Sequence, residues 1–176
     1  MSQLIRLRDF AFLLYDVLDA EALCASERYS MHNRSVFDAI LKTAKKVAED
    51  LFENHAAALD QEPPELKGRE VVMMPAVKAG TDAFAENGFS AGPFPEEWGG
   101  LSLPAVVCNT YNLFFNAANI STSSYVGLTM AAANLLAAHG DDALKGRYLE
   151  PLVTGRFFGT MCLSEPHAGS SLANLR

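Results

Sequence analysis

The sequence predicts a mainly α-helical protein, in which antiparallel helices occupy residues 1–155 and one β-strand follows them. Apolar residues recur at the three- and four-residue spacing of amphipathic helices through most of this region. Glycine and proline clusters separate the helical stretches. Only residues 156–163 have the aromatic and bulky apolar composition of a strand. The chain has 176 residues, of which 49% are hydrophobic and 20% charged, so it favours one folded domain over disorder.

Three helices are expected in the first half of the chain. The first covers residues 7–23, and a polar break at 26–33 separates it from the second, at 34–52. In the second helix the apolar residues form one continuous stripe, and charged residues occupy the other face. A third helix is expected at 71–86, with Pro75 in its first turn and Gly88 at its end, where glycine accepts left-handed backbone.

The second half begins with a shaped loop at 92–100, because two prolines and three glycines in nine residues exclude regular structure. Two apolar helices are expected at 104–117 and 122–138, followed by a short helix at 141–149. Asp141 and Asp142 suit the positive N-terminal end of that helix. The strand at 156–163 completes the predicted order.

No charged residue occurs between Trp98 and Gly140, which raises the question of a membrane hairpin. Asparagine, serine and threonine interrupt this stretch, so it contains no apolar run of membrane-spanning length. We expect a buried helical hairpin and no membrane span, with the membrane hairpin as the alternative. The start of the chain lacks the features of a signal peptide.

The net charge of −7 provides no basic stripe for phosphates, so nucleic acid is not an expected partner. Cys24, Cys108 and Cys162 are widely spaced and form no Cys-x-x-Cys pair, which predicts neither a disulfide framework nor a zinc site. The four histidines are also scattered, so no metal site is expected. Cysteine usage is typical of a reducing, cytoplasmic protein.

A turn with hydroxyl and glycine residues follows the predicted strand, at 164–171. Ser164 precedes Pro166, and Gly169, Ser170 and Ser171 come after it. Glycine permits a close approach of the backbone, so amides and hydroxyls here could contact a planar or phosphorylated ligand. By themselves, these residues favour an ordinary surface turn over a ligand-binding turn.

Four motifs in order extend this observation, at residues 95–100, 135–140, 145–152 and 161–170. Together they resemble the acyl-CoA dehydrogenases. Residues 7–18 are similar to the amino-terminal extension of a larger subtype that includes the 3-methylmercaptopropionyl-CoA dehydrogenases. The resemblance implies an extension and linker at 1–33, the helical amino-terminal domain at 34–155, and the start of a truncated middle β-domain at 156–176.

The resemblance also implies a function. The family uses FAD to introduce a double bond between Cα and Cβ of an acyl-CoA thioester, with hydride passing to flavin N5 and electrons to an electron-transfer flavoprotein. Flavin contacts are expected at Met161, Leu163, Ser164, Gly169 and Ser170. Contacts with the acyl-CoA substrate are expected at Ser170, Val126 and Met130. A homo-oligomer, either dimer or tetramer, is also implied.

The catalytic base of the family comes from a carboxy-terminal helical domain, so no catalytic residue is expected here and this chain alone should be inactive. Glu165 matches a structural position in the turn. Ser164 stands where the family usually has threonine, which keeps the hydroxyl, whereas Ser171 replaces an aspartate and Met161 replaces a residue that is often aromatic. A different hypothesis is a non-catalytic helical module that self-associates through apolar faces.

Overall fold

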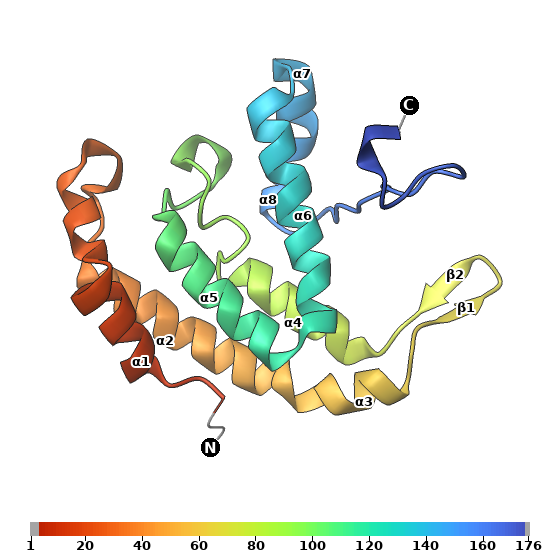
Figure 1. Cartoon of the computed structure of the whole chain (residues 1–176), viewed down its shortest axis with the longest axis horizontal. Coiled ribbons are helices and arrows are strands. Elements are labelled where there is room, and N and C mark those ends of the chain that lie inside the picture. Colours follow the sequence, from red (N-terminus) through yellow and green to blue (C-terminus); the bar gives the residue numbers. More distant parts are fainter. Residues whose placement is uncertain (1–3, 175–176) are drawn as a thin grey trace.

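In the computed structural model, which describes residues 4–174, the long helices pack around one main hydrophobic core (Figure 1). In chain order the elements are α1 Leu7–Ala11, α2 Arg34–Leu51, α3 Ala56–Gln61, β1 Glu65–Lys67, β2 Glu70–Val72, α4 Pro75–Glu86, α5 Ala105–Ala118, α6 Ile120–His139, α7 Asp142–Leu144 and α8 Glu150–Val153. Short 3₁₀ or π-helical turns lie at Phe12–Val17, Ala20–Ala25, Glu27–Tyr29, Glu53–His55, Glu96–Trp98, Lys145–Leu149 and Leu172–Asn174. The mainly helical fold class is confirmed.

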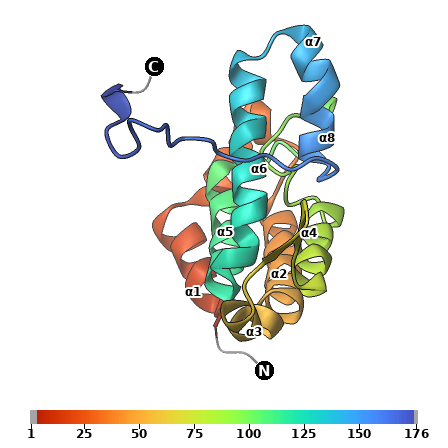
Figure 2. The same ribbon diagram turned by 90° about the vertical axis from the view of Figure 1, so that its right-hand side faces the viewer.

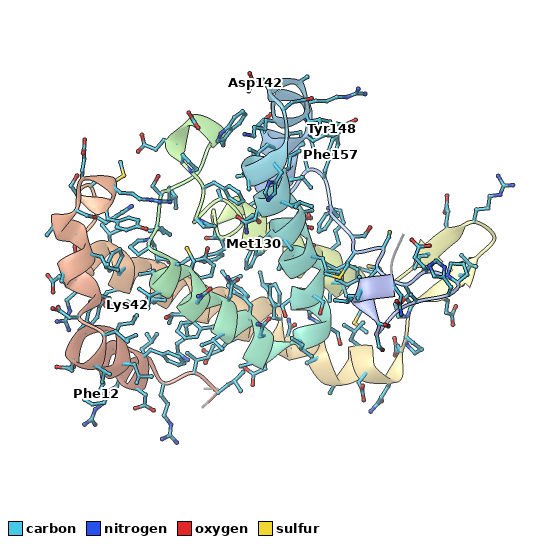
Figure 3. All side chains as sticks on the ribbon, turned by 45° about the horizontal axis from the view of Figure 1, so that its top comes forward. Phe12, Lys42, Met130, Asp142, Tyr148 and Phe157 are labelled. Atoms are coloured by element: carbon cyan, nitrogen blue, oxygen red, sulfur yellow. The ribbon has the colours of Figure 1, made fainter. Side chains whose placement is uncertain are left out.

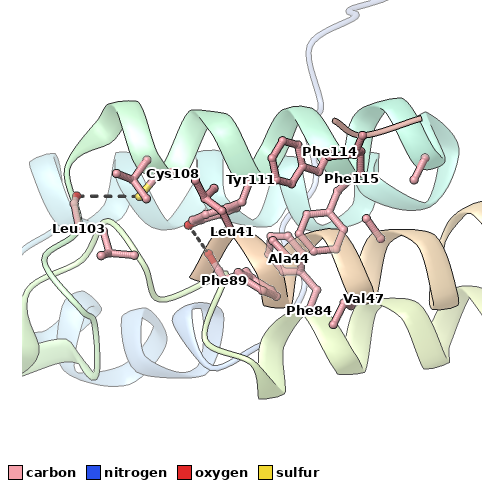
Figure 4. Packing of buried hydrophobic residues seen from close by; sticks show 14 of the residues in the cluster. Leu41, Ala44, Val47, Phe84, Phe89, Leu103, Cys108, Tyr111, Phe114 and Phe115 are labelled. Carbon is pink, nitrogen blue, oxygen red and sulfur yellow. Dashed lines mark hydrogen bonds between the residues drawn. The ribbon is translucent and has the colours of Figure 1, made fainter. Parts of the chain in front are cut away.

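Aromatic side chains from several helices meet at the centre of the core (Figure 4). The ring of Phe115 on α5 lies 4.8 Å from those of Phe52 and Phe84, in edge-on geometry. All three rings are fully buried. Burying a side chain of this kind contributes roughly 1.5–3 kcal/mol. The cluster therefore connects α4 and α5 with the residue that follows α2.

One buried asparagine links α5 to α6. Asn119 caps α6, because its Oδ1 accepts a hydrogen bond from the Thr122 amide at 3.0 Å. Its Nδ2 donates to the Phe52 carbonyl at 3.2 Å, so the same side chain also holds the end of α2. Beside it, His55 Nε2 and the Thr122 hydroxyl are 2.8 Å apart. The turn into α6 is thus attached to a segment far away in the sequence.

The prediction for the apolar stretch 98–140 is confirmed, because it forms the helical pair α5 and α6. No helix within residues 4–174 combines the length and the hydropathy that a membrane crossing requires. Helix α2 also forms as predicted, and α4 ends where it was predicted to end. Pro75 is at the start of α4, and Gly88 has a positive φ of 76° directly after its end.

The predicted helix at 7–23 is interrupted. Helix α1 continues into the π turn Phe12–Val17, and then Asp19 adopts left-handed backbone with φ 47°. The change of direction lets both Leu14 and Ala20 reach the core, where they are 2% and 1% exposed. Periodicity alone does not reveal such a turn, because the apolar spacing continues through it.

A short hairpin was not predicted. Strands β1 and β2 pair in antiparallel register, with Lys67 opposite Glu70. Gly68 occupies the turn with φ 67°, a backbone that glycine adopts without strain. Val71 and Val72 belong to β2, so α4 begins four residues later than the predicted helix.

The strand predicted at 156–163 does not form within the described chain. This segment is irregular and extends away from α6 toward the C-terminal end (Figures 1 and 2). A strand needs a neighbour that satisfies its backbone donors and acceptors, and none lies beside these residues in the described structure. The composition was that of a strand, but pairing decides whether one exists.

Candidate functional site

The segment with the predicted ligand contacts starts at a close contact between Gly159 and α6. The Gly159 amide donates to the Thr129 hydroxyl at 3.1 Å, and that hydroxyl in turn donates to the Tyr125 carbonyl at 2.8 Å. A Cβ on Gly159 would lie only 2.6 Å from the Ala132 Cβ. Glycine at 159 and alanine at 132 therefore allow the backbone to rest directly on the helix.

Beyond this contact, residues 160–174 form an arm that is largely exposed. Glu165 and Ala168 exchange backbone hydrogen bonds of 2.7 Å and 3.2 Å, which close a tight turn around Pro166 and His167. The turn brings Gly169 next to Ser164, whose Oγ would lie 3.4 Å from a Cβ at 169. Two of the predicted flavin-contacting residues are thus adjacent.

The remaining predicted residues of the arm face solvent. Met161 and Leu163 are 63% and 42% exposed. The hydroxyls of Ser164 and Ser170 are also exposed, and neither forms a hydrogen bond with another residue in 4–174. These hydroxyls can therefore donate to a ligand by exchanging a hydrogen bond with water, without breaking a bond inside the described chain. The arm therefore presents two hydroxyl groups to solvent.

Val126 and Met130 lie one turn apart on the side of α6 that packs against the core. Val126 is 5% exposed, while Met130 is only partly buried and packs against the core cluster (Figure 3). The arm crosses α6 beside them, at Thr129 and Ala132. Of the two predicted substrate-contacting residues, Met130 is the more accessible.

A groove between α6 and the α7–α8 segment was not predicted. Its volume is about 670 Å³ and its lining is mostly apolar. Figure 3 labels two of the lining residues, Tyr148 and Phe157. The lining residues are Ala132, Leu135, Leu136, His139, Gly140, Leu144, Tyr148, Leu152, Phe157, Phe158 and Gly159. Phe157 and Phe158 are 43% and 50% exposed there. The sequence signal for this groove was the run Phe157-Phe158-Gly159. We attributed that run to a predicted strand and not to a groove.

The buried titratable groups belong to the core and not to the arm. Burial lowers the pKa of the His55 imidazole and raises the pKa of the Cys108 thiol to about 11. Among the residues that the structure describes, the buried polar side chains include no aspartate or glutamate. Glu165, Glu96 and Glu97 are exposed.

Comparison with known proteins decides the family. The profile of the "Acyl-CoA dehydrogenase, N-terminal domain" family matches residues 37–156, more than half of the chain. The chain belongs to the acyl-CoA dehydrogenases. The matched range contains Phe52, Phe84 and Phe115 of the core and the whole of α6, and it ends just before Phe157, Phe158 and Gly159 of the groove.

Individual acyl-CoA dehydrogenases agree with this assignment. The chain is 38% identical over 117 residues to 3-methylmercaptopropionyl-CoA dehydrogenase of Ruegeria pomeroyi, which covers 66% of this chain and 20% of that protein. In fold it is similar to butyryl-CoA dehydrogenase of Megasphaera elsdenii, with a TM-score of 0.67, 19% identity and coverage of 82% and 36%. A chain in the structure of the electron transferring flavoprotein of Acidaminococcus fermentans matches at a TM-score of 0.62 and 22% identity, with coverage of 78% and 34%. The chain thus spans between a fifth and about a third of these proteins.

Proposed function

We propose that this chain is the helical amino-terminal part of an FAD-dependent enzyme that dehydrogenates acyl-CoA thioesters between Cα and Cβ. The observation that supports the proposal most directly is the family match over residues 37–156. The serine- and glycine-rich turn at 164–171 lies C-terminal to that range, at the position where the family resemblance predicts flavin and substrate contacts. Fold class and family membership do not by themselves establish activity, so the proposal depends on this turn.

In this proposal the arm binds the flavin. Exposed backbone groups at Met161, Leu163 and Gly169 and the free hydroxyl of Ser164 would lie against the ring, and bound FAD would supply the hydride acceptor. Hydroxyl and amide donors that are held in place stabilise negative charge on a ring better than mobile water does. The lack of a partner for the Ser164 hydroxyl within the described chain fits this role.

The acyl-CoA would lie between the arm and α6. Ser170 would contact the thioester portion, while Val126 and Met130 would shape the apolar wall. The base that removes the α-proton would lie outside these 176 residues, as the family resemblance implies. We therefore propose that the isolated chain is inactive and that an electron-transfer flavoprotein accepts the electrons.

The three cysteines Cys24, Cys108 and Cys162 are free. Free thiols persist in reducing compartments, so we propose a cytoplasmic location. On the basis of the family resemblance, we also propose that the protein forms a homo-oligomer.

The test is spectroscopic and uses the protein from the complete reading frame that contains these residues. Its flavin absorbance should bleach when acyl-CoA thioesters, from butyryl-CoA to 3-methylmercaptopropionyl-CoA, are added. Ser164→Ala should slow the bleaching, because it removes a donor to the reduced ring, by roughly tenfold or more if the donor acts like those of oxyanion sites. Ser26→Ala, in the polar linker, is the matched control and should not change the rate. A colourless protein that ignores every thioester would contradict the proposal.

One observation favours the alternative of a non-catalytic association module. The groove and the arm expose apolar side chains, among them Phe158, Met161 and Leu163. Exposed apolar patches commonly mark association surfaces. Flavin content separates the two hypotheses, because an association module needs no FAD.

A further inference from the structure

The arm leaves the helical domain through two hydrogen bonds to different helices. The Phe157 amide donates to the Pro151 carbonyl of α8 at 2.9 Å, and two residues later the Gly159 amide donates to the Thr129 hydroxyl of α6 at 3.1 Å. Figure 2 shows this segment passing α6 on its way to the C-terminal end. Further along, the hydrogen bonds of residues 160–174 join arm residues to one another. Within the described chain, Thr129 is therefore the last point at which the helical domain is hydrogen-bonded to the arm.

The Thr129 hydroxyl makes both of its bonds in a buried position. It accepts from the Gly159 amide and donates to the Tyr125 carbonyl at 2.8 Å, one helical turn earlier. A hydroxyl has one donor and two acceptor positions, so the two bonds do not compete. The Thr129 side chain is 4% exposed, which leaves water little access to replace either bond. The bond to the helix backbone thus holds the oxygen in place for the amide of the arm.

Packing at the same point fixes the register of the arm on α6. A Cβ at position 159 would lie 3.2 Å from both the Leu128 carbonyl oxygen and the Thr129 Cα, in addition to its clash with Ala132. The residues on either side of Gly159, Phe158 and Thr160, both carry a Cβ. A slip of one residue in either direction would therefore force a Cβ against the helix.

We propose that Thr129 is a positioning residue, which fixes the arm on α6 and thereby places the flavin-contacting residues; the inference rests on the proposed function of the arm. Met161 is two residues beyond Gly159, and Ser164 is five. An extended chain covers about 7 Å and about 17 Å over these lengths, so the fixed point at Gly159 limits where both residues can lie. Without the Thr129 bond, the nearest hydrogen bond to the domain is that of Phe157, and the free part of the chain is two residues longer.

The role of Thr129 is indirect, because its hydroxyl is buried and already has a donor and an acceptor partner. In this respect it differs from Ser164 and Ser170, whose hydroxyls face solvent. Thr129 therefore acts on the flavin through the backbone of the arm. Reacting groups must be held in the right geometry for a fast transfer, so a looser arm should slow the transfer of hydride.

A second threonine provides a matched control. Thr110 on α5 is 6% exposed, and its hydroxyl donates to the Val106 carbonyl at 2.8 Å, four residues earlier. The bond to the helix is thus the same as in Thr129, but within residues 4–174 no arm residue donates to Thr110. Thr110→Val removes a buried hydroxyl and its intrahelical bond, whereas Thr129→Val also removes the bond to the arm.

The first experiment measures the attachment of the arm in the 176-residue chain and needs no flavin. Trypsin cleavage at the exposed Arg156 reports how often the segment around it opens. Thr129→Val should speed this cleavage roughly two- to tenfold, as expected for the loss of one hydrogen bond. Thr129→Ser keeps the hydroxyl and should be cut at the wild-type rate, as should Thr110→Val. Far-UV circular dichroism checks that the helices are retained in each variant.

The second experiment measures flavin reduction in the protein from the complete reading frame. At a saturating concentration of butyryl-CoA or 3-methylmercaptopropionyl-CoA, whichever bleaches the wild type faster, Thr129→Val should reduce the flavin roughly two- to tenfold more slowly. Thr129→Ser should restore the wild-type rate, and Thr110→Val should retain it. A general loss of stability would affect Thr129→Val and Thr110→Val alike, so the comparison isolates the bond to the arm.

The outcomes separate this inference from the proposed function. A wild-type protein that contains flavin, together with a Thr129→Val variant that is cut or reduced at the wild-type rate, overturns the inference alone. Failure of Thr129→Ser to restore both rates also overturns it, because the hydroxyl would then not be the group that matters. A wild-type protein that binds no flavin overturns the proposed function and this role with it, even if cleavage at Arg156 still depends on Thr129.

Discussion

Replacing Asn119 by alanine tests how the turn between α5 and α6 is held. The side chain is 5% exposed and makes two bonds, one from the Thr122 amide to Oδ1 and one from Nδ2 to the Phe52 carbonyl. Loss of an asparagine N-cap costs about 1 kcal/mol. A buried carbonyl left without its donor costs about 1–3 kcal/mol more. The free energy of unfolding should therefore fall by about 2–4 kcal/mol in Asn119→Ala.

Asn33→Ala is the matched control, because Asn33 caps α2 in the same way. Its Oδ1 accepts from the Val36 amide at 3.1 Å, but this end of α2 is exposed and the side chain holds no distant carbonyl. The variant loses the cap and an exposed hydrogen bond from the Ser35 hydroxyl, so the expected cost is about 1 kcal/mol. Asn119→Ser keeps a cap acceptor but removes the amide donor, and should fall between the two.

Urea denaturation followed by far-UV circular dichroism measures all three variants. The slope of the free energy against urea concentration should stay unchanged, because the surface exposed on unfolding is the same. If Asn119→Ala costs no more than Asn33→Ala, the bond to the Phe52 carbonyl contributes nothing and the reasoning is refuted.

Two further predictions concern the arm and the core. Gly159→Ala places a Cβ 2.6 Å from the Ala132 Cβ, so the arm should detach from α6 at a cost of about 1–3 kcal/mol. Trypsin should then cut faster at the exposed Arg156. Gly127→Ala is the control and should leave cleavage unchanged, because its new Cβ meets no atom within 4 Å. Unchanged cleavage in Gly159→Ala would mean that the close contact does not hold the arm. Burial lowers the pKa of His55, so the unfolded chain takes up its proton first and stability should fall as the pH drops below about 6.5. His55→Gln should show a smaller loss of melting temperature between neutral and mildly acidic pH, and an equal loss would assign the acid sensitivity to other groups.

The helices were predictable where local chemistry and burial agree. Helix α2 has its apolar residues on one face and asparagine at its N-cap, so both its existence and its start follow from the sequence. Helix α4 has proline in its first turn and glycine after its end. The hairpin was missed because β1 and β2 are only three residues long and exposed, so they have no alternating burial pattern. A glycine between two short extended runs was the one usable signal.

The candidate site was also predictable from the sequence only in part. The turn around Pro166 was recognisable from its residues, and the adjacency of Ser164 and Gly169 follows from the tight closure that those residues permit. The groove required Phe157 to meet α6 and Tyr148, which come from different parts of the chain. Composition suggested a strand for the same residues. Without a partner strand, the aromatic side chains instead lie along a helix.

The sequence by itself determined the family, the succession of helices and the identity of the exposed hydroxyl-rich turn, because these depend on periodicity, capping residues and ordered motifs that are local. The tertiary structure decided that Asn119 binds the end of α2, that Gly159 rests on Ala132, and that the Leu14 side chain is buried whereas that of Phe12 is exposed. Each of these depends on which atoms of distant segments come within contact distance. The sequence pattern predicts whether one face of a helix is polar or apolar. Only the packed structure shows whether another element already covers that face.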